Sequence, residues 1–156
     1  IKTIDEIKNI AENLHKINKV IVTTSGSFDI LHYAHIDLLD KAKKEGDILI
    51  VLLNSDSSIK KIKGEKRPII PEDERAHMLA ALESVNYVVI FNEDKPLSII
   101  REIKPNRHVK GGSYILDRIK EEKELVESWG GKYKTFDLKE GYSTTNIIEK
   151  IIALHG

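Results

Sequence analysis

The stretch Gly26-Ser27-Phe28-Asp29-Ile30-Leu31-His32-Tyr33-Ala34-His35 decides the fold of this chain. It follows the apolar residues 20–22, which predict a buried strand, and leads into residues 36–44, whose apolar side chains recur at helical spacing. A strand that turns through glycine into a helix forms an anion site, because the first N–H groups of a helix have no partner inside it. His32 and His35 lie three apart on one helix face and can reach the same ligand. No cluster of metal ligands lies nearby in the sequence, so we expect a phosphate site.

Composition limits what the chain can do. Its 156 residues include 25 Lys and Arg and 25 Asp and Glu, so the formal net charge is zero, which argues against a general nucleic-acid binder. The absence of cysteine excludes disulfides, thiolate metal sites and cysteine nucleophiles. No apolar run is long enough to span a bilayer, and residues 1–17 do not form a signal peptide. We therefore expect a soluble, cytoplasmic protein that binds neither nucleic acid nor membrane.

Apolar runs and helical periodicities alternate along the chain. Five strands are predicted, near residues 19–24, 48–53, 87–91, 108–109 and 133–138. The longer helices are predicted at residues 4–14, 36–45, 71–83, 96–103, 117–129 and 146–154, with a short one after residue 57. The pattern predicts an α/β fold: a single Rossmann-like, doubly wound domain over residues 1–156, with a mainly parallel five-stranded sheet. The N-terminal helix, within residues 1–17, is expected to pack on the sheet edge or on a partner chain.

The histidine pair admits two interpretations. An arbitrary His-x-x-His is as often a pair of surface or supporting histidines as a ligand-binding pair. Here the pair follows a strand–glycine–helix turn, which favours a phosphate role for His32 and His35. A zinc site is the weakest alternative, because the sequence groups no further ligands with the pair.

Residues 60–68 are basic and broken by glycine and proline, which predicts a loop. Most such runs are solvated charged loops. This one follows the active-site end of the predicted second strand, where it can close over phosphates. We expect at least one of Lys60, Lys61 and Lys63 to contact phosphate, with Lys63 favoured.

Three other polar segments follow predicted strands or open a helix. Ser143-Thr144-Thr145 is expected to cap the last helix, and the same geometry presents N–H groups and hydroxyls to an anion. Lys110-Gly111-Gly112 permits close approach to a ligand or makes a tight turn. Asp56, within Asn54-Ser55-Asp56-Ser57, is expected at the rim of the site.

The remaining candidates have structural interpretations. Arg75 is as readily explained by an ion pair with Glu72 or another neighbour as by ligand binding. The other histidines have no partner at a useful spacing, and we expect ordinary roles for His15, His77, His108 and His155.

Two segments of the sequence resemble motifs of a known family. Residues 26–35 resemble the G-x-F-D-x-x-H-x-G-H motif of the cytidylyltransferase-like nucleotidyltransferases, and residues 143–148, S-T-T-N-I-I, resemble their second motif. The finer resemblance, over nearly the whole chain from Lys19, is to the adenylyltransferases of ADP-heptose synthesis. It is carried by Asn54-Ser55-Asp56, Lys63-Gly64, Arg67-Pro68, Ala81-Leu82-Glu83-Ser84-Val85 and Val109-Lys110-Gly111-Gly112.

The resemblance implies transfer of AMP from ATP, with Mg²⁺ on the triphosphate, to a heptose 1-phosphate, giving ADP-heptose and pyrophosphate. It implies catalytic roles for His32, His35 and Lys63 and no metal-ligating side chain. The nucleotide would lie against Ser25, Gly26, Ser27, Phe28, Ser143, Thr144 and Thr145, besides the catalytic residues. The substrate would be positioned by Asp29, Asp56, Lys110, Gly111 and Gly112, with Asp29 and Asp56 also able to position the metal. The family suggests a homodimer, and because this sequence holds no sugar-kinase domain, a separate kinase would supply the sugar 1-phosphate.

Three positions depart from the pattern. Ala34 replaces the glycine between the histidines, and Ser25 and Ser113 stand where the heptose group usually has Asn and Asp. Alternatives therefore stay open: CTP with glycerol 3-phosphate or ATP with flavin mononucleotide in the same fold, or a nucleotide-binding module without turnover.

Overall fold

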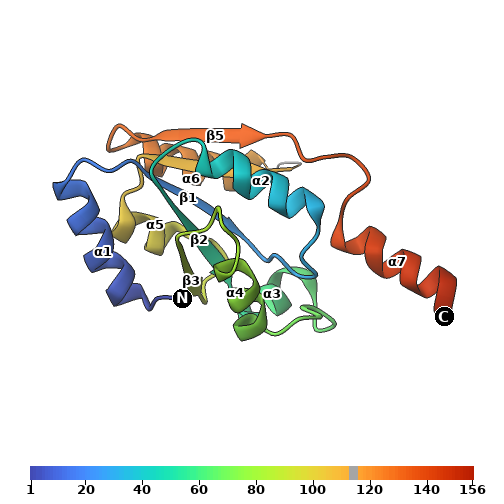
Figure 1. Ribbon diagram of the computed structural model, residues 1–156. Coiled ribbons are helices and arrows are strands. Elements are labelled where there is room, and N and C mark those ends of the chain that lie inside the picture. The colour runs from blue at the N-terminus through green and yellow to red at the C-terminus, as the bar shows by residue number, and fades with distance from the viewer. Residues whose placement is uncertain (113–115) are drawn as a thin grey trace.

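The computed structural model describes residues 1–112 and 116–156, so the departure at Ser113 lies outside the described residues. The described chain forms an α/β fold with a five-stranded sheet (Figure 1). The strands are β1 (Ile21–Gly26), β2 (Ile48–Asn54), β3 (Tyr87–Phe91), β4 (Arg107–Gly111) and β5 (Lys132–Phe136). Their order is β3-β2-β1-β4-β5, and every neighbouring pair is parallel. The predicted fold class is confirmed, and the sheet is wholly parallel.

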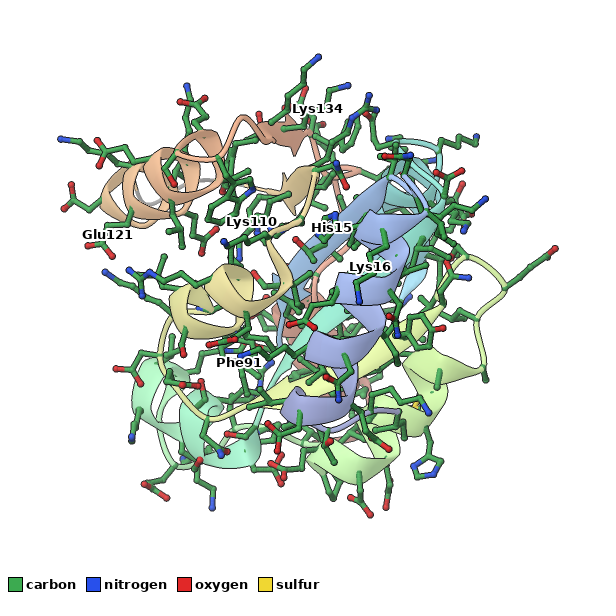
Figure 2. All side chains as sticks on the ribbon, turned by 90° about the vertical axis from the view of Figure 1, so that its left-hand side faces the viewer. His15, Lys16, Phe91, Lys110, Glu121 and Lys134 are labelled. Atoms are coloured by element: carbon green, nitrogen blue, oxygen red, sulfur yellow. The ribbon has the colours of Figure 1, made fainter. Side chains whose placement is uncertain are left out.

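Helices cover both faces of this sheet. They are α1 (Ile4–Lys16), α2 (Tyr33–Lys43), α3 (Asp56–Lys63), α4 (Glu72–Ala80), α5 (Leu97–Ile103), α6 (Leu116–Glu127) and α7 (Thr144–His155). Alternate residues of β2 point to opposite faces: Leu49, Val51 and Leu53 pack with α2 and α4, and Ile50 and Leu52 pack with α1 and α5. This double burial explains why the strand is a continuous apolar run. Figure 2 looks onto the face that α1 and α5 cover.

The N-terminal helix forms as predicted but packs in a different place. Thr3 and Glu6 form a reciprocal capping box, with the Glu6 amide donating to Thr3 Oγ1 at 3.2 Å and the Thr3 amide to Glu6 Oε2 at 2.8 Å. Ile7 and Ala11 are buried in the core cluster on the sheet face. The expected position at the sheet edge is therefore wrong, because these two side chains complete an apolar layer over the strands.

The basic segment is helical at its start, which corrects the predicted loop. Ser55 caps α3 by accepting a hydrogen bond from the Ser58 amide at 3.2 Å, and the buried Ile59 anchors the helix on the core. Lys60, Lys61 and Lys63 therefore lie in the last turn of α3, and the loop begins at Gly64, whose φ of 94° ends the helix.

The last helix stands apart from the core. None of the residues of α7 is buried, and Ile151, Ile152 and Leu154 are 53%, 63% and 66% exposed. In Figure 1, α7 projects from the body after the long segment that follows β5. Across the described residues, no helix combines the length and apolarity needed to cross a membrane.

Candidate active site

The turn between β1 and α2 has an unusual backbone. Phe28 and Ile30 adopt positive φ angles of 47° and 51°, a region that costs energy for residues with a Cβ atom and that clusters at functional sites. α2 begins at Tyr33, earlier than the predicted residue 36, because His35 Nδ1 accepts the His32 amide hydrogen at 3.3 Å at the helix start. The two imidazole rings stack with centroids 3.7 Å apart. The turn therefore presents both histidines as one unit.

Asp29 holds this turn in place. Its carboxylate accepts hydrogen bonds from Arg67 Nε at 2.8 Å and from the amides of Ile69 and Ile70 at 2.9 Å each, and its side chain is fully buried. Burial opposes the charge, but these donors outweigh it and hold the pKa of Asp29 below its usual value. The carboxylate predicted to position substrate or metal is thus engaged inside the protein, where it ties the turn to residues 67–70.

The buried side chain of Arg75 also links separate segments of the chain. It is 1% exposed and donates to the carbonyl oxygens of Ser27 at 2.6 Å and Asn54 at 2.9 Å. Its remaining terminal nitrogen donates to Asp56 Oδ1 at 2.7 Å. The expected ion pair is therefore made with Asp56, whereas Glu72 accepts the Asp56 amide at 2.6 Å. Arg75 therefore links the carboxyl ends of β1 and β2 at one edge of the sheet.

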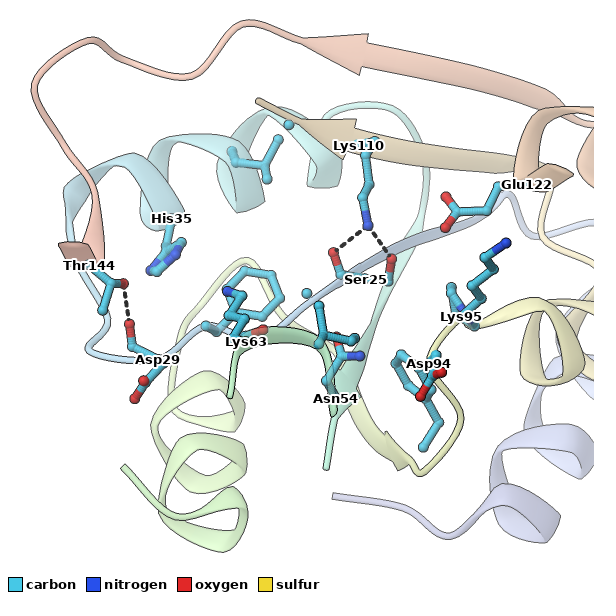
Figure 3. A pocket seen from close by; sticks show the side chains of 18 of the residues that line it. Ser25, Asp29, His35, Asn54, Lys63, Asp94, Lys95, Lys110, Glu122 and Thr144 are labelled. Atoms are coloured by element: carbon cyan, nitrogen blue, oxygen red, sulfur yellow. Dashed lines mark hydrogen bonds between the residues drawn. The ribbon is translucent and has the colours of Figure 1, made fainter. Parts of the chain in front are cut away.

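A cavity of about 260 Å³ lies at that edge (Figure 3). Since the strand order reverses between β1 and β4, this is the switch point where ligands bind in open α/β sheets. The predicted residues that line it are Ser25, Gly26, Ser27, Phe28, Asp29, His35, Lys63, Lys110, Gly111 and Thr144. Five other predicted residues, His32, Asp56, Gly112, Ser143 and Thr145, are not among its lining residues. Most of the predicted site is therefore brought together.

The two signature segments meet at this cavity. Ser143 caps α7 by accepting the Asn146 amide hydrogen at 3.0 Å, as predicted. The Thr144 hydroxyl donates to the backbone carbonyl oxygen of Asp29. The start of α7, the positive end of its helix dipole, therefore faces the glycine turn of β1.

The surroundings lower the pKa values of three basic groups at this site. Burial, reinforced by the charges of His32 and Lys63, lowers the pKa of His35 to about 4, and burial also lowers the pKa of His32. Burial together with Arg67 lowers the pKa of Lys63. The imidazole of His35 is thus neutral at pH 7, and an arriving anion would favour its protonation.

Sequence reasoning missed one side of the cavity. Asp94, Lys95 and Glu122 also line it, together with the apolar residues Leu38, Ile62, Phe91, Pro96 and Leu138, whereas the lining residue Asn54 lies in the segment expected at the rim. His108, for which an ordinary role was expected, is fully buried with Nδ1 2.7 Å from Thr23 Oγ1 and Nε2 3.5 Å from Glu122 Oε2. The one available signal was a histidine inside an apolar strand, because an imidazole buried there needs polar partners.

The described part of the chain contains no group of three or more His, Asp or Glu side chains that could hold a metal ion.

Comparisons with known proteins show which family the chain belongs to. A family model described as cytidylyltransferase-like matches residues 23–150. Two curated relatives, both named bifunctional protein HldE, are 49% identical: one from Geobacter metallireducens over the whole chain and one from Aliarcobacter butzleri over 97% of it. The chain spans about a third of their length, 32% and 31%.

Two solved structures share the fold. The lipopolysaccharide core biosynthesis protein from Thermoplasma volcanium superposes with a TM-score of 0.66 at 28% identity, covering 81% of this chain and all of that one. A pantoate-beta-alanine ligase from Francisella tularensis has the same TM-score at 17% identity, over 98% of this chain and 77% of that one, and shows the fold alone. With both signatures in one cavity and the family model spanning most of the sequence, the chain belongs to the cytidylyltransferase-like family of nucleotidyltransferases.

Proposed function

We propose that this protein transfers AMP from MgATP to a heptose 1-phosphate, giving ADP-heptose and pyrophosphate. The observation that carries the proposal is the junction of the two signature segments, where the Thr144 hydroxyl bonds the Asp29 carbonyl beside His35 and Gly26. The identity of nearly half to the HldE proteins, and the resemblance to the adenylyltransferases of ADP-heptose synthesis, favour this pair of substrates.

The transfer is a single in-line displacement. An oxygen of the sugar phosphate forms a bond to the α-phosphorus of ATP, and the bond between that phosphorus and the bridging oxygen of pyrophosphate breaks. Pyrophosphate leaves with the electron pair. The chemistry requires charge stabilisation and alignment rather than a covalent enzyme intermediate.

Each basic group has a place in this step. His32 and His35 donate hydrogen bonds to phosphate oxygens as charge builds on them, and Lys63 neutralises the outer phosphates from the end of α3. Ser143, Thr144 and the first N–H groups of α7 hold the same phosphates. Magnesium arrives with ATP and supplies further charge neutralisation across the phosphates.

Ala34 bears on the alternative of a module without turnover. Its side chain is 1% exposed and packs within the protein, and Ala34 is not a lining residue of the cavity. The fold therefore accommodates the extra methyl group inside the protein, which favours an active enzyme.

The test is pyrophosphate release with ATP, CTP and GTP, each offered with heptose 1-phosphate, glycerol 3-phosphate and flavin mononucleotide. Release with ATP and heptose 1-phosphate, lost in His35→Ala, supports the proposal. Release with CTP and glycerol 3-phosphate, or with ATP and flavin mononucleotide, keeps the mechanism and replaces the substrates. No release from any pair, with ATP still bound in a calorimeter, refutes the catalytic proposal.

Two further proposals concern partners. The acceptor carries a phosphate when it arrives, so a sugar-kinase activity precedes this step. The exposed isoleucines and leucine of α7 favour a homodimer, since pairing two copies would cover them. Light scattering of the purified protein tests the dimer, and a monomeric mass at micromolar concentration would exclude it.

A further inference from the structure

The cavity has two chemically different sides. In Figure 3, His35 and Thr144 lie on one side, and Lys110, Glu122, Lys95 and Asp94 lie on the other, with Ser25 between them. The first side carries the phosphate-binding groups described above. The second side comes from β4, α6 and the segment between β3 and α5, and no role in the reaction has been assigned to its acidic residues.

Glu122 is built into this second side with unusual support. It is 3% exposed, yet it lines the cavity. Tyr133 donates its hydroxyl hydrogen to Glu122 Oε2 at 3.2 Å, and His108 Nε2 lies 3.5 Å from the same oxygen. Burial alone would raise the pKa of Glu122, but His108, Lys110 and Tyr133 together hold it below its ordinary value. The cavity therefore contains a fixed carboxylate that stays charged at neutral pH.

Two ammonium groups accompany this carboxylate. Lys110 Nζ donates to Ser25 Oγ at 2.9 Å, at the boundary between the two sides. Lys95 lines the cavity, with its Nζ 3.0 Å from Glu121 Oε2 on the surface of α6. Carboxylates and ammonium groups in alternation match hydroxyl groups, because each hydroxyl donates one hydrogen bond and accepts others.

The acidic groups also decide which part of the reactants can lie here. On this side Glu122 and Asp94 offset the positive charges of Lys95 and Lys110, so the triphosphate is attracted more strongly to the side that carries His35, Lys63 and Thr144. A nucleobase prefers apolar walls, and Leu38 and Leu138 supply one in the same cavity. A Cβ atom added at Gly111 would lie 2.8 Å from Leu38 and 2.9 Å from Leu138, so glycine lets these two leucines pack directly against the backbone of β4 and form an apolar wall.

We propose that Glu122, with Lys95 and Lys110, binds the hydroxyl groups of the acceptor sugar and selects a polyhydroxylated phosphate ester over other acceptors. This inference rests on the proposed function and assigns the acceptor to one side of the cavity. Glu122 and Lys95 are specificity residues, whereas His108 and Tyr133 position the carboxylate of Glu122.

The experiment measures steady-state kinetics of pyrophosphate release for Glu122→Gln with ATP and heptose 1-phosphate varied in turn. We expect KM for heptose 1-phosphate to rise about tenfold or more, as loss of a charged hydrogen-bond acceptor predicts, and KM for ATP to stay within about twofold. Lys95→Gln, at a more exposed position, should raise the same KM about threefold to tenfold. The matched controls are Glu124→Gln and Lys123→Gln, whose side chains are 67% and 53% exposed on α6.

Deoxy analogues of the sugar phosphate identify the contact directly. A hydroxyl bound by Glu122 should raise KM when removed from the sugar in the wild type, but add little in Glu122→Gln. A rise in KM for ATP alone, or unchanged constants for both substrates in Glu122→Gln and Lys95→Gln, overturns the proposal. If Glu122→Gln lowers the thermal stability of the protein, the KM of Lys95→Gln for heptose 1-phosphate tests the proposal instead. Absence of release by the wild type with every acceptor is a separate result, because it refutes the proposed function.

Discussion

The hydroxyl of Thr144 bonds the backbone carbonyl oxygen of Asp29, a residue 115 positions earlier in the chain. This bond joins the start of α7 to the strained turn that carries the histidines. It is the point at which the two short motifs meet at the cavity.

Replacing Thr144 with Val should therefore impair nucleotide handling more than folding. Val keeps the shape of Thr but cannot donate the hydrogen bond. We expect kcat/KM for ATP to fall about fivefold, since one hydrogen bond contributes about 1 kcal/mol, and Thr144→Ser should recover most of it. Kinetics of pyrophosphate release measure the effect, with Thr135→Val on the exposed side of β5 as the control. Equal losses in both valine variants would contradict the proposed link.

Asp29 should matter mainly to stability. Asp29→Asn removes the charge that Arg67 and the amides of Ile69 and Ile70 surround, and breaking such a buried pair costs about 3 kcal/mol. Because the folded pKa lies below the ordinary 3.8, the charged form stabilises the fold fully at neutral pH. That contribution is lost as the pH falls below about 4 towards the folded pKa.

Urea unfolding at pH 7 and at pH 3 tests this prediction. The variant and the wild type should differ strongly at pH 7 and less at pH 3. Asp40→Asn, on the exposed surface of α2, serves as the matched control. An Asp29→Asn protein with wild-type stability and a raised KM would instead return Asp29 to substrate binding.

ATP binding should take up protons through His35. Before ATP binds, the pKa of His35 is about 4, so the ring is neutral at pH 6, and the triphosphate raises that pKa. Calorimetry of MgATP binding at pH 6 in buffers of different ionisation enthalpy should show uptake approaching one proton. His35→Gln should abolish most of that uptake, and His155→Gln, at the exposed end of α7, should not change it. Identical uptake in all three proteins would remove His35 from the phosphate site.

The same pKa shift predicts how the protein without nucleotide responds to acid. An unfolded histidine binds protons below about 6.5, whereas folded His35 resists protonation down to about 4. The unfolded state therefore binds more protons between these values, and stability falls as the pH drops from 6.5 to 4. The free energy of unfolding should vary less steeply with pH across this range for His35→Gln than for the wild type. Parallel curves for the two proteins would mean that His35 carries no such linkage.

Replacing Lys63 should lower activity far more than replacing its neighbour Lys61 on α3. Both Lys61 and Lys63 are exposed, but Lys63 lines the cavity and Lys61 does not. Lys63→Met should lower kcat/KM about 100-fold, the usual cost of one lost donor to developing charge, and Lys61→Met should stay within about twofold of the wild type. Similar losses in both would mean that the segment acts only through its general positive charge, and the loss would then fade with added salt.

The parts of the fold that could be predicted from sequence depend on neighbouring residues. Residues 48–53 and 87–91 are continuous apolar runs because a parallel strand is buried on both faces, and they became β2 and β3. His32 and His35 share a helix turn, so their spacing alone placed them together. Ser143 was recognised as a cap because capping is local.

The parts that could not be predicted depend on contacts between distant residues. Asp29 accepts hydrogen bonds from Arg67 and the Ile69 amide, about forty positions later in the chain. The residues next to Asp29 in the sequence do not indicate these partners. Glu122 looks like any other acid of an amphipathic helix until packing sets it beside His108 of β4. The lysines of α3 resembled a loop because Gly64 and Pro68 follow them, whereas the helix is fixed by Ser55 and Ile59.

No residue of α7 is buried, so we expect assembly of the site to be separable from folding of the core. Every member of the two core clusters lies before residue 137, so their packing does not require the last helix. A chain cut after residue 140 should keep its thermal transition and lose nucleotide transfer. Residues 141–156 supplied as a peptide, or fused to another protein, would then restore transfer in proportion to docking. The two pieces could therefore serve as a split enzyme. If each piece were fused to one of two proteins, nucleotide transfer would report that those two proteins bind each other.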